Sequence, residues 1–177
     1  MTHQVPVGRN IELKFRVKDL AAMTKAAESI ADSTPKILDQ VDTFFYCADG
    51  RLKLREFGNG RGELIHYRRE DARGPVESSY LLLSVDQPRE LLGVLLRAPG
   101  SHGTVSKRRT LYRQGRTRIH IDEVRGLGDF IEIEVVMAAG EAKEAGIEAT
   151  GQLARQLQLS DAKAVEGSYL DLLGSPG

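Results

Sequence analysis

Apolar and polar residues alternate through most of this chain, with a few segments of helical period between the alternating ones. Residues 10–17 read Asn-Ile-Glu-Leu-Lys-Phe-Arg-Val, an unbroken two-residue period. This period is typical of a strand with one buried face. Comparable patterns predict seven further strands, at residues 37–47, 52–55, 63–69, 78–85, 104–112, 116–124 and 129–137. Glycine-containing turns such as Asp49-Gly50 separate several of them and predict hairpins.

A helical period replaces the alternation in a few places. It predicts helices at residues 19–31, 88–97, 140–157 and 169–173. Asp19 suits the N-cap of the first helix, and Pro88 suits the first turn of the second. Hairpin-linked strands with helices at the start, middle and end indicate an α+β fold on an antiparallel sheet, and eight strands are enough to close a β-barrel. We expect a single domain over residues 1–177, with its core at about residues 10–174.

The polar faces of these strands carry formal charge. Asn10, Glu12 and Lys14 share one face of the first strand. Other same-face sets follow along the chain: Lys53 and Arg55; His66 and Arg68; Lys107 and Arg109; Arg116, Arg118, His120 and Asp122; Glu132 and Glu134. A flat sheet with this face in water is one interpretation, because charged faces are usually solvated. A sheet curled with the charged face inward is the other, and it requires an anion and a metal for neutralisation. A polyphosphate with its counter-cation would fit.

Composition narrows the class of protein. The 177 residues contain 25 Lys and Arg against 25 Asp and Glu, so no basic excess favours nucleic acid as a partner. No run approaches the roughly 20 apolar residues of a membrane helix, and residues 1–9 lack the apolar stretch of a secretory signal. Cys47 is the single cysteine and cannot form an internal disulfide. We expect it to be a buried thiol in a cytoplasmic protein without a membrane partner.

Several motifs in fixed order resemble the CYTH family, the triphosphate tunnel enzymes that include class IV adenylyl cyclases and thiamine triphosphatases. The matching segments are residues 10–14, 42–45, 52–55, 107–109, 118–122, 126–134 and 168–173. The Gly-Leu-Gly-Asp-Phe run at residues 126–130 leans toward the class IV cyclase branch. The resemblance implies an eight-stranded antiparallel β-barrel that forms a triphosphate tunnel with flanking helices. It therefore favours the inward charged face.

The resemblance also implies roles for individual residues. The expected ligands of Mg²⁺ or Mn²⁺ are Glu12, Glu132, Glu134 and Asp122. The expected phosphate-binding residues are Lys14, Lys53, Arg55, Arg68, Lys107, Arg109 and Arg118. Glu12, Lys14, Asp122 and His120 are the candidate catalytic residues. One departure weakens the metal site, because Asn10 occupies the place of the first glutamate of the family's opening strand and supplies no charge.

Three functions remain open on these residues. The first is a class IV-like adenylyl cyclase that converts ATP to cyclic AMP and pyrophosphate. The second is a triphosphatase acting on a small organic or inorganic triphosphate, although the absence of Trp disfavours thiamine triphosphate. The third is a non-catalytic nucleotide or polyphosphate binder. The expected partner is a nucleoside triphosphate or another small triphosphate, and dimers are common in the family, so a homodimer is a further expectation.

Overall fold

The computed structural model describes residues 7–159 and 164–174 of the chain. Its strands are β1 (Gly8–Arg16), β2 (Lys36–Phe45), β3 (Arg51–Phe57), β4 (Gly62–Arg69), β5 (Val76–Val85), β6 (Ser101–Gln114), β7 (Thr117–Val124) and β8 (Gly128–Val136). Its helices are α1 (Leu20–Ile30), α2 (Pro88–Arg97), α3 (Lys143–Gln156) and α4 (Tyr169–Leu173). Every helix and strand expected from the sequence is present in this part of the chain. The outermost residues of the predicted domain, 1–6 and 175–177, lie outside the described residues.

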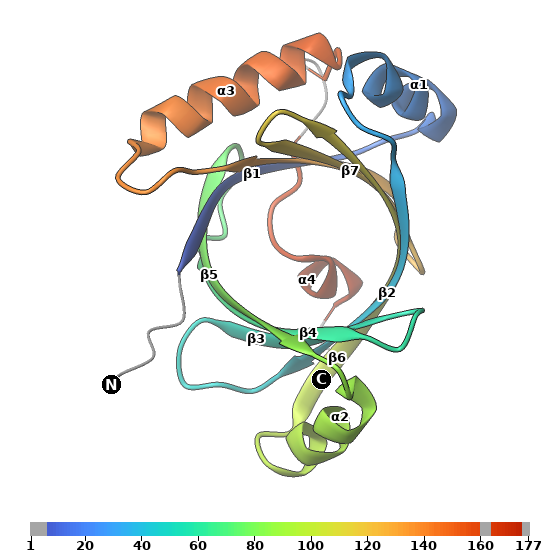
Figure 1. Ribbon diagram of the computed structural model, residues 1–177, viewed down its shortest axis with the longest axis vertical. Coiled ribbons are helices and arrows are strands. Elements are labelled where there is room, and N and C mark those ends of the chain that lie inside the picture. The colour runs from blue at the N-terminus through green and yellow to red at the C-terminus, as the bar shows by residue number, and fades with distance from the viewer. Residues whose placement is uncertain (1–6, 160–163, 175–177) are drawn as a thin grey trace.

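The strands form a closed barrel in the order β1-β5-β4-β3-β2-β6-β7-β8, seen nearly end-on in Figure 1. All neighbouring pairs are antiparallel, and β8 closes the barrel against β1. The closing register places Glu12 opposite Glu134 and Lys14 opposite Glu132. The prediction of an eight-stranded antiparallel barrel is therefore confirmed.

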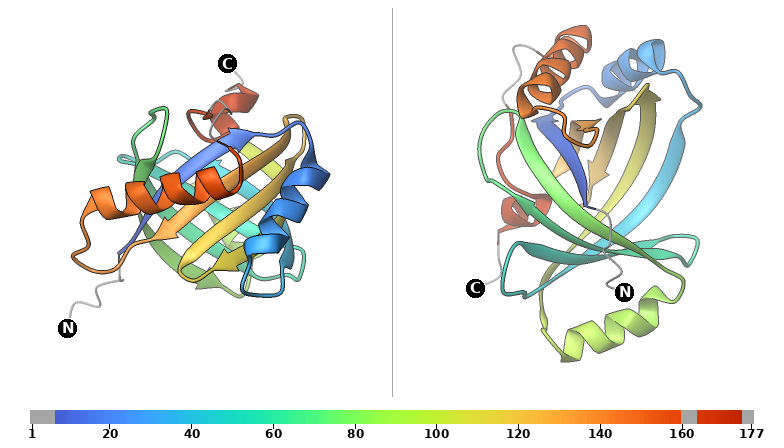
Figure 2. Two further views of the ribbon diagram at one scale, coloured as in Figure 1. Left: turned by 90° about the horizontal axis from the view of Figure 1, so that it is seen from above. Right: turned by 60° about the vertical axis from the view of Figure 1, so that its left-hand side comes forward.

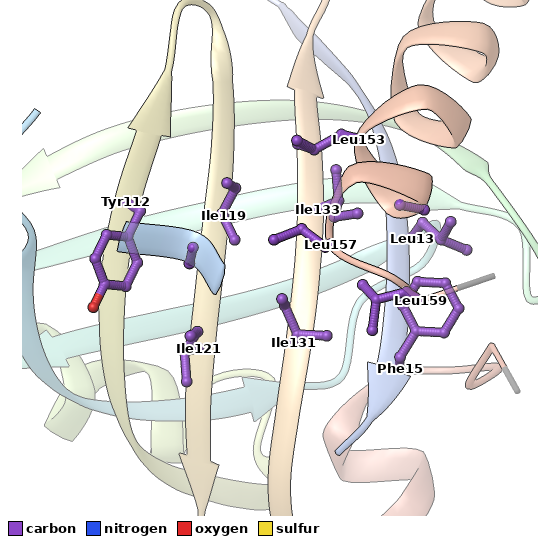
Figure 3. Close-up of a cluster of buried hydrophobic side chains, with 12 residues drawn as sticks. Leu13, Phe15, Tyr112, Ile119, Ile121, Ile131, Ile133, Leu153, Leu157 and Leu159 are labelled. Atoms are coloured by element: carbon purple, nitrogen blue, oxygen red, sulfur yellow. The ribbon is translucent and has the colours of Figure 1, made fainter. Parts of the chain in front are cut away.

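The apolar faces of β1, β7 and β8 point outward, under α1 and α3, which cover this side of the barrel (Figure 2). Their side chains form one cluster with those of the helices: Leu13, Phe15, Ala27, Tyr112, Ile119, Ile121, Ile131, Ile133, Leu153, Ala154, Leu157 and Leu159. Figure 3 shows Ile131 and Ile133 directed toward Leu157. Full burial stabilises each such aliphatic side chain by about 1.5–3 kcal/mol. Because alternate residues face opposite sides of a strand, this packing turns the polar face into the barrel.

The C-terminal helix α4 covers one end of the barrel, as Figures 1 and 2 show from three directions. The Ser168 hydroxyl caps it by accepting a hydrogen bond from the Asp171 amide. Tyr169 and Leu170 are buried, and Leu170 lies against Gly103, where an added Cβ would come within 2.4 Å of a leucine methyl carbon. The absence of a side chain at position 103 therefore allows α4 to approach β6 closely.

Two local expectations differ from the structure. Helix α3 begins at Lys143 rather than at residue 140, because Gly140 has a left-handed φ of +74° that belongs to a turn. Cys47 was expected to be buried and is exposed instead, since it lies just past the end of β2 in the hairpin that leads to β3. Within residues 7–159 and 164–174, no helix combines the length and hydrophobicity that a membrane crossing requires.

Candidate functional site

A cavity of about 320 Å³ occupies the barrel interior, within the size range of small-molecule sites. Charged and amide side chains from β1, β2, β3, β4, β6, β7 and β8 line it, together with Ser168 and Tyr169 at the covered end. The charged faces converge on one enclosed space, and most of the expected site residues meet there: Glu12, Lys14, Lys53, Arg55, Lys107, Arg109, Arg118, His120, Glu132 and Glu134.

One carboxylate, Asp42 of β2, organises the basic side of the cavity. It accepts hydrogen bonds from Lys53 Nζ at 3.0 Å, from Arg55 Nε at 2.8 Å and from Lys107 Nζ at 3.4 Å. Burial alone would raise the pKa of Asp42, but the charges of Arg55, Lys107 and Lys53 hold this pKa well below its usual range. A single negative charge faces three basic groups, so this part of the cavity attracts an anion with several acceptor oxygens. We call Asp42, Lys53, Arg55 and Lys107 the cationic cluster.

Arg109 of β6 links the cationic cluster to the acidic side of the cavity. Its guanidinium donates to both Asp122 oxygens, at 2.7 and 2.6 Å, and to Glu132 at 2.9 Å. Asp122 has no exposed surface, and it also accepts a hydrogen bond of 2.8 Å from the Tyr169 hydroxyl. Asp122 does not line the cavity. In this arrangement Asp122 holds Arg109 in place, and the metal-binding and catalytic roles expected for Asp122 stay predictions.

Three carboxylates face the cavity from β1 and β8. Glu132 lies 3.5 Å from Lys14 Nζ, and Glu12 lies 3.3 Å from Arg69. Glu134 lies 2.8 Å from Arg118, in an ion pair without an aligned hydrogen bond. Burial, together with the charges of Glu12 and Glu132, raises the pKa of Glu134 to about 7.

His120 lies between two of these carboxylates. Its Nδ1 is 3.3 Å from Glu132 and its Nε2 is 3.7 Å from Glu134. Burial and the nearby Arg109 guanidinium lower the pKa of His120 to about 4, although Glu132 opposes this shift. The imidazole is therefore neutral near neutral pH and offers one donor and one acceptor nitrogen to its surroundings.

The residues of this acidic side suit a hard divalent cation. Carboxylate oxygens are the ligands that Mg²⁺ prefers, and the clustered charge that raises the pKa of Glu134 would be relieved by a cation. The Oδ1 atom of Asn10 is buried without a hydrogen-bond partner, while its amide nitrogen donates to Glu134. Among residues 7–159 and 164–174, no three His, Cys, Asp or Glu side chains form a ready-made metal site. Glu132 is instead engaged by Lys14, Arg109 and His120.

Strand β4 turns toward the interior the face opposite to the one expected from the sequence. Arg68 was expected to bind phosphate, but its side chain is 67% exposed and pairs with Asp49 on the outer surface. The inward set of β4 consists of Glu63, Ile65, Tyr67 and Arg69. Arg69, next to Arg68 in sequence, supplies the interior charge through its ion pair with Glu12.

Two further cavity residues, Asp42 and Tyr169, were not identified from the sequence as site residues. Asp42 was noted only as part of a family motif, although its two-residue spacing from Gln40 and Phe44 places it on an inward face. Tyr169 was likewise noted only as part of the family segment at residues 168–173, because its place in the cavity follows from packing of α4 and not from a strand period. Its ring lies 4.2 Å from Lys14 Nζ and 5.3 Å from Lys107 Nζ, so it supports both ammonium groups by cation–π interactions.

A larger hollow, of about 1060 Å³, lies outside the barrel beside the start of α2. Its lining includes charged residues of both signs from the outer faces of the strands, such as Asp39, Glu56, Arg108 and Glu123. Exposed pairs such as Arg108 with Asp39 contribute about 0–1 kcal/mol. Lys107 is the one expected site residue in the described lining, so the chemistry is concentrated in the smaller interior cavity.

Comparison with solved structures identifies proteins that share this barrel. The PH1012 protein of Pyrococcus horikoshii OT3 is similar with a TM-score of 0.82 and 26% identity, over 93% of this chain and 99% of that chain. An adenylate cyclase candidate from Vibrio parahaemolyticus has a TM-score of 0.75 and 22% identity, over 94% and 98% of the two chains. An adenylyl cyclase candidate from Hippeastrum with a dominant triphosphatase activity has a TM-score of 0.68 and 16% identity, over 94% of each chain.

Comparison with curated proteins finds no match. Comparison with family models matches residues 8–169 to the CYTH domain, which is most of the chain and includes every strand of the barrel. The match agrees with the motifs at residues 10–14 and 118–134 and with the interior cavity that they line. The chain therefore belongs to the CYTH family, whose members act on triphosphates as adenylyl cyclases or triphosphatases.

Proposed function

We propose that this protein is a metal-dependent enzyme of the class IV adenylyl cyclase type, which converts ATP to cyclic AMP and pyrophosphate. The observation that carries the proposal is the cationic cluster inside a cavity covered at one end by α4, with carboxylates on neighbouring strands. A triphosphate supplies the several charged oxygens that this cluster lacks. The run at residues 126–130 supports the cyclase branch over the other activities of the family.

The residues divide into groups by charge. The phosphate oxygens are bound by Lys53, Arg55 and Lys107. Arg109 and Lys14 line the same cavity. Asp42 and Asp122 hold these side chains in place through the hydrogen bonds described above. Glu12, Glu132 and Glu134 are the residues that would hold Mg²⁺ or Mn²⁺. When bound, such a cation would neutralise phosphate charge and lower the pKa of the attacking hydroxyl.

The reaction itself requires little covalent chemistry from the protein. The ribose 3′-oxygen forms a bond to the α-phosphorus, the bond from that phosphorus to the β-phosphate oxygen breaks, and pyrophosphate leaves with the released electron pair. The hydroxyl proton is lost in the same process. Most of the barrier reduction comes from positioning and from charge stabilisation by the basic side chains. His120, kept neutral by burial, is the proposed acceptor for this proton.

Hydrolysis would use the same cavity, with a different phosphorus aligned with the attacking nucleophile. In a triphosphatase, water attacks the terminal phosphorus, so ADP and phosphate replace cyclic AMP and pyrophosphate. Incubation with Mg²⁺ or Mn²⁺ and a panel of ATP, GTP, tripolyphosphate and thiamine triphosphate separates these activities by their products. Cyclic AMP from ATP supports the proposal, and phosphate release without cyclic AMP overturns it in favour of a triphosphatase. Tight binding of ATP with neither product would identify a binding protein.

Lys107 provides a proton-linked test of triphosphate binding. The charged groups around it are Asp42, Lys53, Arg55, Arg109, Asp122 and Tyr169. Burial, with the charges of Arg109 and Arg55, lowers the pKa of Lys107 to about 7 despite the opposing effect of Asp42. At about pH 8.5 the free protein therefore holds this amine neutral, and a bound polyanion restores its charge. We expect tripolyphosphate binding at this pH to take up about one proton more than binding to a variant whose side chain at position 107 keeps its charge.

Titration calorimetry in two buffers with different ionisation enthalpies measures this uptake. The matched control is Lys107→Arg, because arginine keeps its proton throughout this range. Binding to the arginine variant should take up about one proton fewer than binding to the wild-type protein. Equal uptake by the two proteins would show that Lys107 does not change its charge on binding.

A further inference from the structure

Apolar and aromatic side chains gather at the uncovered end of the barrel cavity, beside the charged Glu63, Arg113 and Arg118. We call the five uncharged ones the entrance collar: Leu38, Phe57, Tyr80, Leu82 and Leu111. None of the five is fully buried, and Leu82 is 40% exposed. The collar lies at the opposite end of the barrel from α4, while the cationic cluster lies deeper. A ligand that entered this cavity would therefore pass apolar side chains before its anionic end met the cationic cluster.

The position of Tyr80 in this collar is fixed by close packing. Its ring lies over Gly8 on the neighbouring strand, and an added Cβ at position 8 would come within 2.3 Å of the ring carbon Cζ. Glycine at this position leaves room for the aromatic ring. Phe57 supplies a second ring from β3. Aromatic rings in such a setting pack well against a planar ligand group.

Gln40 lies at the boundary between the collar and the cationic cluster. On β2 it is the inward residue between Leu38 of the collar and Asp42 of the cluster, and its cross-strand partners are Phe57 and Lys107. The side chain is only 3% exposed, yet its Oε1 atom has no hydrogen-bond partner among the described residues. A buried acceptor of this kind is normally satisfied, so its position inside a ligand cavity indicates a donor supplied by the ligand.

We infer that the collar and Gln40 form a subsite for a planar, N–H-bearing ring of an organic triphosphate, with the ring between the collar side chains and its N–H donated to Gln40 Oε1. The inference rests on the proposed function, because it requires the triphosphate to occupy the cationic cluster. With the phosphates there, the group attached to the first phosphate extends toward Gln40 and the collar. An inorganic polyphosphate would leave the collar empty and Gln40 unpaired. The chain therefore selects organic triphosphates, of which a nucleobase-bearing one has the required chemistry.

The test compares two ligands that share the phosphates and differ in the ring. Dissociation constants of ATP and of tripolyphosphate are measured by titration calorimetry for the wild-type protein and for Gln40→Leu. The variant keeps the size of the side chain and removes its acceptor. We expect the dissociation constant of ATP to rise about tenfold and that of tripolyphosphate to change less than twofold. Gln87→Leu, an exposed glutamine before α2, is the matched control and should alter neither constant.

Each outcome distinguishes this subsite from the phosphate site. Equal weakening of the two ligands would place Gln40 among the phosphate contacts, and unchanged ATP binding would remove it from the site; either result overturns the inference. If the wild-type protein bound neither ligand, the proposed function would fail as well. Phe57→Leu provides a second variant should Gln40→Leu fold poorly. The Phe57→Leu variant should have a several-fold higher dissociation constant for ATP and an unchanged one for tripolyphosphate. An unchanged ratio of the two dissociation constants would overturn the subsite.

Discussion

Substitution of Glu132 by glutamine should lower metal-dependent turnover by about a hundredfold or more while the barrel stays folded. Glu132 is in contact with Lys14, Arg109 and His120, and it is a proposed ligand of the divalent cation. Glutamine has almost the same shape but carries no charge, so it binds a hard cation weakly. Loss of a group that stabilises transition-state charge typically costs a factor of about 10²–10³ in kcat.

Triphosphate binding without metal should not weaken in this variant, because the removed charge is negative. The experiment therefore measures kcat at saturating metal and the dissociation constant of tripolyphosphate without metal, with circular dichroism to confirm the fold. Glu123→Gln is the matched control, since Glu123 is an exposed carboxylate on neighbouring β7. This substitution should change neither kcat nor the dissociation constant of tripolyphosphate. Wild-type turnover by the Glu132→Gln protein would remove this residue from the metal site.

Substitution of Asp42 by asparagine should produce the largest loss of stability, about 3–5 kcal/mol in the free energy of unfolding. Asp42 is the shared partner of Lys53, Arg55 and Lys107, so the variant leaves buried positive charge without compensation. A bound polyanion would restore that compensation. Tripolyphosphate should therefore raise the melting temperature of Asp42→Asn more than that of the wild-type protein, as measured by differential scanning calorimetry.

The control lies three residues earlier on the same strand. Asp39 pairs with Arg108 on the outer surface, and Asp39→Asn should cost only about 0–1 kcal/mol. Similar losses in the two variants would contradict the central role of Asp42. The pH dependence gives a further check, because the folded pKa of Asp42 lies well below its unfolded value. Its stabilisation is complete above about pH 4 and is lost as the pH falls toward the folded pKa, so wild type and variant should converge in acid.

The alternation predicted the strands and their charged faces, and the resemblance to the CYTH family predicted that these faces line a barrel, but the period failed on β4. Both faces of this strand carry basic and uncharged side chains, so the period alone could not choose between Arg68 and Arg69. The choice is made by the register with β5, where Tyr67 pairs with Tyr80 and Arg69 with Ser78. A period defines two faces, and only the pairing with a neighbouring strand tells which face is inside.

The supporting contacts of the site could not be predicted, since they join residues far apart in sequence. Tyr169 donates to Asp122 across 47 positions, and Asp122 in turn holds Arg109. The sequence showed that Asp122 belongs to the charged face of β7. Its burial behind Arg109 depends on α4 reaching the end of the barrel, which depends in turn on the contact between Leu170 and Gly103. Roles that follow from such packing depend on the three-dimensional fold and leave no periodic pattern in the sequence.

Because α4 lies across the barrel end nearest the cationic cluster, we expect substrate and products to share one route through the opposite end, and this constrains the kinetic order of the proposed reaction. The leaving pyrophosphate is formed at the inner end of that route, behind the cyclic nucleotide. Cyclic nucleotide should therefore dissociate first and pyrophosphate last. Pyrophosphate would then rebind to the free enzyme and inhibit competitively against ATP, whereas the cyclic nucleotide would inhibit noncompetitively. An enzyme of this design would slow as pyrophosphate accumulates, so its output in a cell would depend on how fast a pyrophosphatase removes that product.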